Sequence, residues 1–161
     1  MRFSGRNLRK AIVCSVVSLC VLPTLSSANT FNGFEGIWRG SGFLVTNEGE
    51  RLKIKCKLVT TINNSGSRVS NLMNCVSTRK AMLVETKLRA SDNKLEGRWK
   101  GAGNSGDITG VAQAGAIRLQ YHGSTVPTTL LVSLENCFQT LKLAGELAGI
   151  TELFVELKKR C

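Results

Sequence analysis

The stretch RLKIKCKL, residues 51–58, alternates strictly between cationic and apolar side chains. Successive side chains of a β-strand point to opposite faces, so this period of two predicts a strand with one buried and one solvated face. The buried face would carry Leu52, Ile54, Cys56 and Leu58. The solvated face would carry Arg51, Lys53, Lys55 and Lys57.

Weaker forms of the same alternation recur around residues 82–89, 117–122 and 152–157. Turn-forming stretches separate them: NEGE, NNSGS, SDNK, GNSGD and HGSTVP. Short amphipathic strands joined by turns are typical of an antiparallel meander. A closed barrel and two packed sheets would both bury these faces, but only a closed barrel removes the exposed edges. We therefore predict an all-β protein, an antiparallel meander of about eight to ten strands closed into a barrel.

The C-terminal segment, residues 134–161, also has the Leu, Ala and Glu content of a helix. Two glycines, Gly145 and Gly149, interrupt that pattern, and its leucines also alternate. We favour two final strands joined between these glycines.

The chain begins with four basic residues, an apolar run over residues 11–22 and the small residues Ser26, Ser27 and Ala28. This order is typical of a secretory signal peptide, which we place at residues 1–28. The apolar run is too short for a membrane span, which needs roughly 20 residues. Residues 29–161 would then form a single domain without a membrane span, periplasmic or secreted. Its 18 basic and 11 acidic residues give a net charge of +7.

Four cysteines remain after the signal, and an even number in an exported domain favours disulfides. Cys56 and Cys75 are centred on the NNSG turn, so a hairpin there would place them opposite each other. Cys137 and Cys161 are centred less neatly, near the last predicted turn. No C-x-x-C pair is present, so we predict no metal site.

Two stretches repeat one pattern: FEGIWRGSG, residues 34–42, and LEGRWKGAG, residues 95–103. Their tryptophans, Trp38 and Trp99, would point into the barrel, and the basic residues that follow would point outward. Gly36 and Gly97 would let the backbone bend or a neighbouring strand approach. Gly40 and Gly101 would leave room for the indoles.

The G-I-W stretch at residues 36–38 resembles the G-x-W motif of lipocalins and other calycin barrels. That resemblance implies a calycin-like barrel whose floor is closed by Trp38. It further implies a covering basic residue from the last strand, for which Lys158, Lys159 and Arg160 are candidates. Nearly the whole mature chain, including GERLKIKCK at residues 49–57, is similar to small uncharacterised exported proteins of alphaproteobacteria, especially rhizobia.

The sequence offers little for catalysis. GAGNSG, residues 101–106, fits G-x-G-x-x-G but is not followed by a helix, so no dinucleotide cofactor is expected. The single histidine, His122, falls next to a turn, and catalytic motifs such as G-x-S-x-G are missing. We therefore expect no enzyme activity and no cofactor.

We expect a binding protein of the cell envelope that holds a small apolar ligand inside the barrel. The candidate cavity residues are Trp38, Trp99, Met82, Leu119 and Tyr121. The alternative is an envelope inhibitor or partner-binding protein that binds a protein or an anionic polymer through its rim loops or the cations at residues 51–57. Nucleic acid is not expected, since this strand has no aromatic side chain on which bases could stack.

Overall fold

The computed structural model describes residues 31–123 and 126–161, which form ten strands. The predicted signal peptide lies outside the described residues. The strands are β1 Gly36–Thr46, β2 Arg51–Ile62, β3 Arg68–Val76, β4 Ala81–Ser91, β5 Lys94–Gly101, β6 Asn104–Gln113, β7 Ala116–Tyr121, β8 Thr128–Glu135, β9 Phe138–Leu147 and β10 Ile150–Lys158. The predicted all-β meander is confirmed. No membrane-spanning helix occurs among the described residues.

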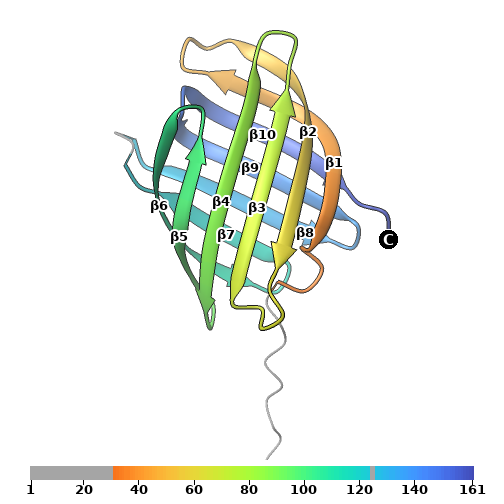
Figure 1. Cartoon of the computed structure of the whole chain (residues 1–161). Coiled ribbons are helices and arrows are strands. Elements are labelled where there is room, and N and C mark those ends of the chain that lie inside the picture. Colours follow the sequence, from red (N-terminus) through yellow and green to blue (C-terminus); the bar gives the residue numbers. More distant parts are fainter. Residues whose placement is uncertain (1–30, 124–125) are drawn as a thin grey trace, which may run out of the picture.

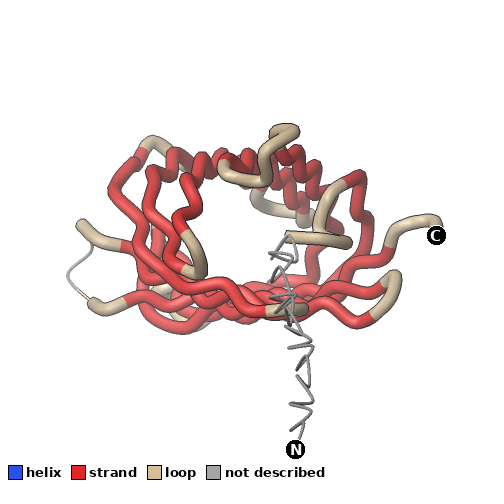
Figure 2. The backbone as a smooth tube through the Cα atoms, turned by 90° about the horizontal axis from the view of Figure 1, so that it is seen from below, coloured by secondary structure: helices blue, strands red, loops and turns tan. Residues whose placement is uncertain are grey.

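Each strand pairs antiparallel with the next, and β1 also pairs with β10 to close the barrel. The steep strands β2 to β5 cross at a large angle in front of β7 to β10 (Figure 1). Seen from below, the strands enclose an oval, and the turn before β1 projects inside it (Figure 2). The first and last strands therefore share the seam of the barrel, where Gly40 lies opposite Leu157.

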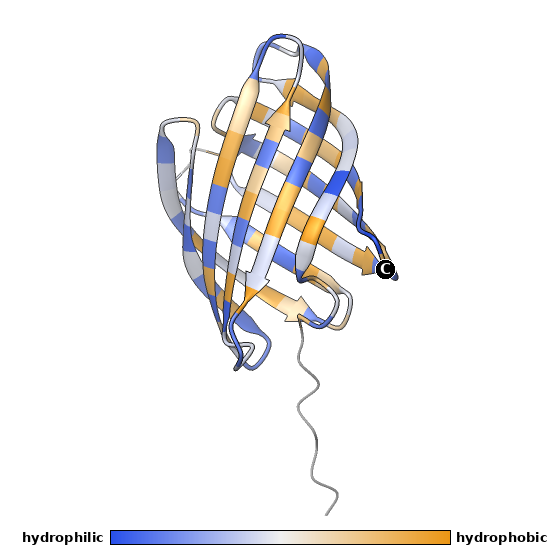
Figure 3. Ribbon diagram, turned by 45° about the vertical axis from the view of Figure 1, so that its right-hand side comes forward, coloured by the Kyte–Doolittle hydropathy of each residue, from blue (hydrophilic) through white to orange (hydrophobic). Residues whose placement is uncertain are grey.

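The strands alternate between buried and exposed residues, as the sequence predicts. In β2 the four apolar positions from Leu52 to Leu58 are buried, and the four cations from Arg51 to Lys57 are exposed. The bands of opposite hydropathy follow one another along the strands in Figure 3. The barrel interior is the hydrophobic core, because all ten strands turn one face inward.

Both predicted disulfides are present. Cys56 of β2 lies directly opposite Cys75 of β3, with 4.1 Å between their Cα atoms, and this disulfide is buried inside the barrel. Cys137 precedes β9 and bonds to Cys161 at the chain end, with Cα atoms 6.0 Å apart. Disulfides of this kind are typical of proteins exported to an oxidising compartment.

The glycines of the repeated motif confirm one expectation and correct another. A Cβ at Gly97 would overlap the backbone of Lys87 on β4, so a neighbouring strand does approach there. The space at Gly40 and Gly101, however, is taken by neighbouring backbones and not by an indole. The glycine beside the Trp99 indole is Gly106, its cross-strand partner, where a Cβ would lie 2.8 Å from Nε1.

Candidate functional site

One end of the barrel is closed by the turn that precedes β1. Phe31 and Phe34 are almost fully buried there, 1% and 2% exposed. The Trp38 indole is completely buried, and its Nε1 donates a hydrogen bond of 2.8 Å to the carbonyl oxygen of Phe34. We call residues 31–35 the floor segment. It inserts two aromatic rings into the barrel and is held by the first tryptophan of the repeated motif.

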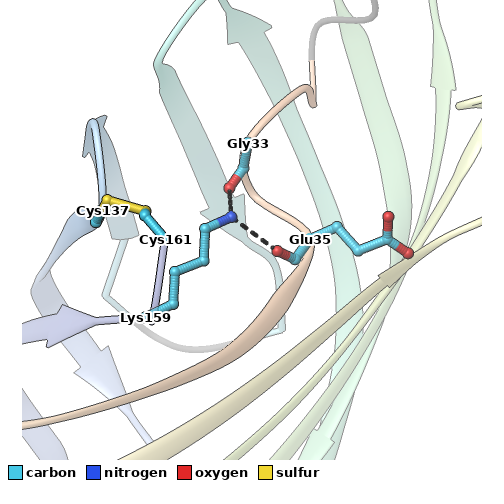
Figure 4. The surroundings of a disulfide bond; sticks show 5 residues. All are labelled: Gly33, Glu35, Cys137, Lys159 and Cys161. Carbon is cyan, nitrogen blue, oxygen red and sulfur yellow. Dashed lines mark hydrogen bonds between the residues drawn. A yellow bond between two sulfur atoms is a disulfide. The ribbon is translucent and has the colours of Figure 1, made fainter.

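The floor segment is also held from the other end of the chain, by Lys159 (Figure 4). The Lys159 ammonium donates hydrogen bonds to the carbonyl oxygens of Gly33 and Glu35. It also lies 4.6 Å from the centre of the Trp38 ring, within the range of a cation–π contact. The covering basic residue implied by the calycin resemblance is therefore Lys159. Two residues further on, the Cys137–Cys161 disulfide ties the chain end to the barrel.

A cavity of about 60 Å³ lies above the floor segment, inside the barrel. Apolar side chains form most of its wall: Phe31, Phe34, Leu58, Val69, Met73, Val84, Leu88, Ile117, Leu119, Leu130, Val132 and Leu141. A cavity needs about 10–15 Å³ for one water molecule and about 150 Å³ for a benzene ring. The cavity thus has room for a few water molecules, and a ring-sized ligand requires side chains of its wall to move.

The cavity wall also carries five polar side chains: Thr60, Asn71, Thr86, Tyr121 and Gln139. The Thr60 hydroxyl donates a hydrogen bond of 2.8 Å to Asn71 Oδ1. Burial raises the pKa of Tyr121 above its ordinary value, while a hydrogen bond with Thr86 acts in the opposite direction. Tyr121 is therefore neutral at pH 7, and none of the described residues that line the cavity is charged.

Gln139 differs from the other polar residues of the wall. It is 4% exposed, and among the described residues its Oε1 has no hydrogen-bond partner. Buried polar atoms without a partner are uncommon in folded proteins and call for an explanation. Sequence patterns alone do not identify this residue, because Gln139 occupies an inward position of a strand whose other buried residues are leucines.

Only some of the five residues predicted to line the cavity do so in the structure. Leu119 and Tyr121 line the cavity. Trp99 is buried beside it, with its ring 5.7 Å from that of Tyr121 in an edge-on arrangement. Trp38 lies in the floor, and Met82 packs in the core opposite Cys75 of the buried disulfide. A direct contact of these five residues with a ligand stays a prediction.

The four cations of β2 form part of a larger charged area on the outside of the barrel. Cross-strand pairing places Arg39 of β1 beside Lys57, and Lys158 of β10 beside Arg39. Arg51 lies 3.5 Å over the ring of Phe43, which stacks on Phe154. We call the outer surface of β2, β1, β10 and β9 the basic face. Its cations are Arg39, Arg51, Lys53, Lys55, Lys57, Lys142 and Lys158. Among the described residues, none of these seven forms a salt bridge.

His122 does not gather a catalytic cluster. It is exposed, and its Nε2 lies 2.7 Å from the Thr109 hydroxyl. GAGNSG spans the end of β5, the turn at Ala102 and Gly103, and the start of β6, and no helix follows it. No group of three or more His, Cys, Asp or Glu that could hold a metal ion occurs in the described part of the chain.

Searches against known protein families and against curated proteins find no match to this chain. The resemblance to exported alphaproteobacterial proteins therefore stays a prediction. Among solved structures, the barrel is similar to the S-type phycobiliprotein lyase CPES from Guillardia theta. The TM-score is 0.56 at 9% sequence identity, and the match covers 79% of this chain and 89% of the lyase. This likeness supports the predicted calycin-like fold.

The likeness also overturns the expectation that the protein is not an enzyme. That expectation relied on the absence of familiar catalytic motifs, yet the chain shares its barrel with a lyase. The sequence identity of 9% means that the fold is shared, and no reaction passes to this chain from the comparison.

Proposed function

We propose that the protein binds a small, uncharged and largely apolar molecule inside its barrel, in the periplasm or outside the cell. The observation that carries this proposal is the cavity inside the barrel, whose wall is apolar apart from five uncharged polar side chains. Concave, mostly apolar cavities with a few polar groups are the usual sites for small molecules. The likeness in fold to a phycobiliprotein lyase supports the proposal, because an enzyme must bind the molecule on which it acts.

The floor segment offers the entrance. Phe31 and Phe34 line the cavity and belong to a short turn rather than to a strand. Their displacement would enlarge the cavity without breaking the hydrogen bonds between strands. Predicted cleavage after Ala28 would place the new N-terminus two residues before Phe31, so the floor segment would continue into a strand on one side only.

Native mass spectrometry of the protein purified from its own host tests the proposal. We expect a discrete extra mass that is lost on mild activation, and a second mass if the bound molecule is converted. In Val132→Phe, the added ring fills the cavity, so the extra mass should disappear. The matched control is Leu131→Phe on the outer face of the same strand, which should retain it. A bare native protein, or equal retention in the two variants, would overturn the proposal.

The basic face supports a second candidate function, the binding of an anionic polymer. Its seven cations are free of salt bridges among the described residues, and those of β2 repeat about every 7 Å along the strand. A regular row of unpaired cations attracts an extended polyanion by its field. The Arg51 side chain covers the Phe43 ring, so that ring is not open for stacking with a base.

Elution from a heparin column tests this second candidate. The double variant Lys53→Glu and Lys55→Glu should elute at a clearly lower salt concentration than the native protein, because four charge units are lost from one row. The control is Lys94→Glu with Lys100→Glu on β5, which makes the same change of charge at two other exposed positions. Equal shifts in both double variants would show that net charge alone binds the column.

A further inference from the structure

We infer that the cavity ligand carries an uncharged hydrogen-bond donor, a hydroxyl or an amide N–H, that meets Gln139 Oε1. This inference rests on the proposed function and names the class of ligand more closely. An ionised ligand is disfavoured, because a buried charge needs a partner of opposite sign and none of the described residues that line the cavity is charged.

The hydrogen bonds of the cavity wall single out Gln139. The Thr60 hydroxyl already donates to Asn71, and the Tyr121 hydroxyl is paired with Thr86. The carbonyl oxygen of the Gln139 amide can only accept, so only a donor satisfies it. A ligand that supplies this donor gains the hydrogen bond and removes the cost of a buried acceptor without a partner.

The position of Gln139 also orients the ligand. Gln139 is the second residue of β9, directly after the turn in which Cys137 is tied to the chain end. It therefore lies at the end of the barrel that the floor segment closes. Leu119 and Leu130, cross-strand partners on β7 and β8, line an apolar part of the wall. The polar group would lie against Gln139 near the floor, and the apolar body would extend along these leucines.

Phenol and toluene are suitable probes, because they have nearly the same shape and only phenol donates a hydrogen bond. Their affinities are measured at pH 7 by NMR titration for the native chain and for Phe34→Ala, which removes a ring from the cavity wall. Each host is then compared with its Gln139→Leu counterpart. We expect the phenol-to-toluene affinity ratio to fall about tenfold on this substitution, as for the loss of one well-placed hydrogen bond.

Leu143→Met, on the same inward face of β9 but outside the cavity wall, is the control and should leave the ratio unchanged. Gln139→Met replaces Gln139→Leu if that variant does not fold. If both probes bind and the ratio is the same with and without Gln139, the inference is wrong. If neither probe binds the native chain or Phe34→Ala, the proposed function fails, and the inference fails with it.

Discussion

Replacing Gly40 with alanine is expected to open the seam of the barrel and to lower the free energy of unfolding by about 3 kcal/mol. Gly40 faces inward on β1 between Cys56 and Leu157. An added Cβ would overlap the Glu156 carbonyl oxygen and lie 2.8 Å from the carbonyl carbon. The obstacle is backbone rather than a movable side chain, so β1 and β10 must separate. Urea denaturation followed by circular dichroism measures the loss.

The control is Ser41→Ala, one residue further along β1. It adds no atoms and should change the free energy of unfolding by less than about 0.5 kcal/mol, as surface substitutions usually do. A Gly40→Ala chain as stable as the native protein would mean that the seam is wider than described. Most domains are stable by only about 5–15 kcal/mol, so the expected loss is large enough to reduce the yield of folded protein.

Trp38→Ala should have an effect of similar size, a loss of about 3–5 kcal/mol. The substitution empties a fully buried site in the floor of the barrel and removes the hydrogen bond to the Phe34 carbonyl. It also removes the ring beneath the Lys159 ammonium. The floor segment loses its main support, so limited proteolysis near residues 31–35 should become faster together with the loss of stability.

Ile37→Ala is the matched control for Trp38→Ala. Ile37 is the preceding residue, points outward and is 48% exposed, so its truncation should cost less than about 1 kcal/mol. Equal losses from the two substitutions would contradict the assigned role of Trp38 in closing the floor.

The positions of the strands and their pairing could be predicted because the alternation of apolar residues and the positions of the turns indicate the same hairpins. Alternation selects the inward face of each strand, and a hairpin turn fixes which residues lie opposite each other. Cys56 and Cys75 satisfy both conditions around a single turn, and the structure pairs them directly. The same turn geometry applied to GAGN places Gly106 opposite Trp99, whereas spacing along the strand alone points to Gly40 and Gly101.

The polar part of the cavity could not be predicted in this way. Thr86 and Gln139 occupy inward positions on strands that are distant in the sequence, β4 and β9. Which inward residues line an opening, and which are packed, depends on side-chain volumes from all around the barrel. Phe31 was missed for a related reason. It precedes the first strand, and alternation says nothing about a turn that folds back under the barrel.

The seam of the barrel and its floor determine which contacts must form last when the chain folds. β1 pairs with β10, and Lys159 of the C-terminal segment binds the floor segment before β1. The barrel can therefore close only when β10 and Lys159 are in place. Contacts between such distant residues form late and slowly during folding. An exported chain would therefore keep its barrel open until its last residues have crossed the membrane. A molecule captured during this interval would be enclosed without passing the floor segment, which would give the cavity a second route of loading beside entry into the folded barrel.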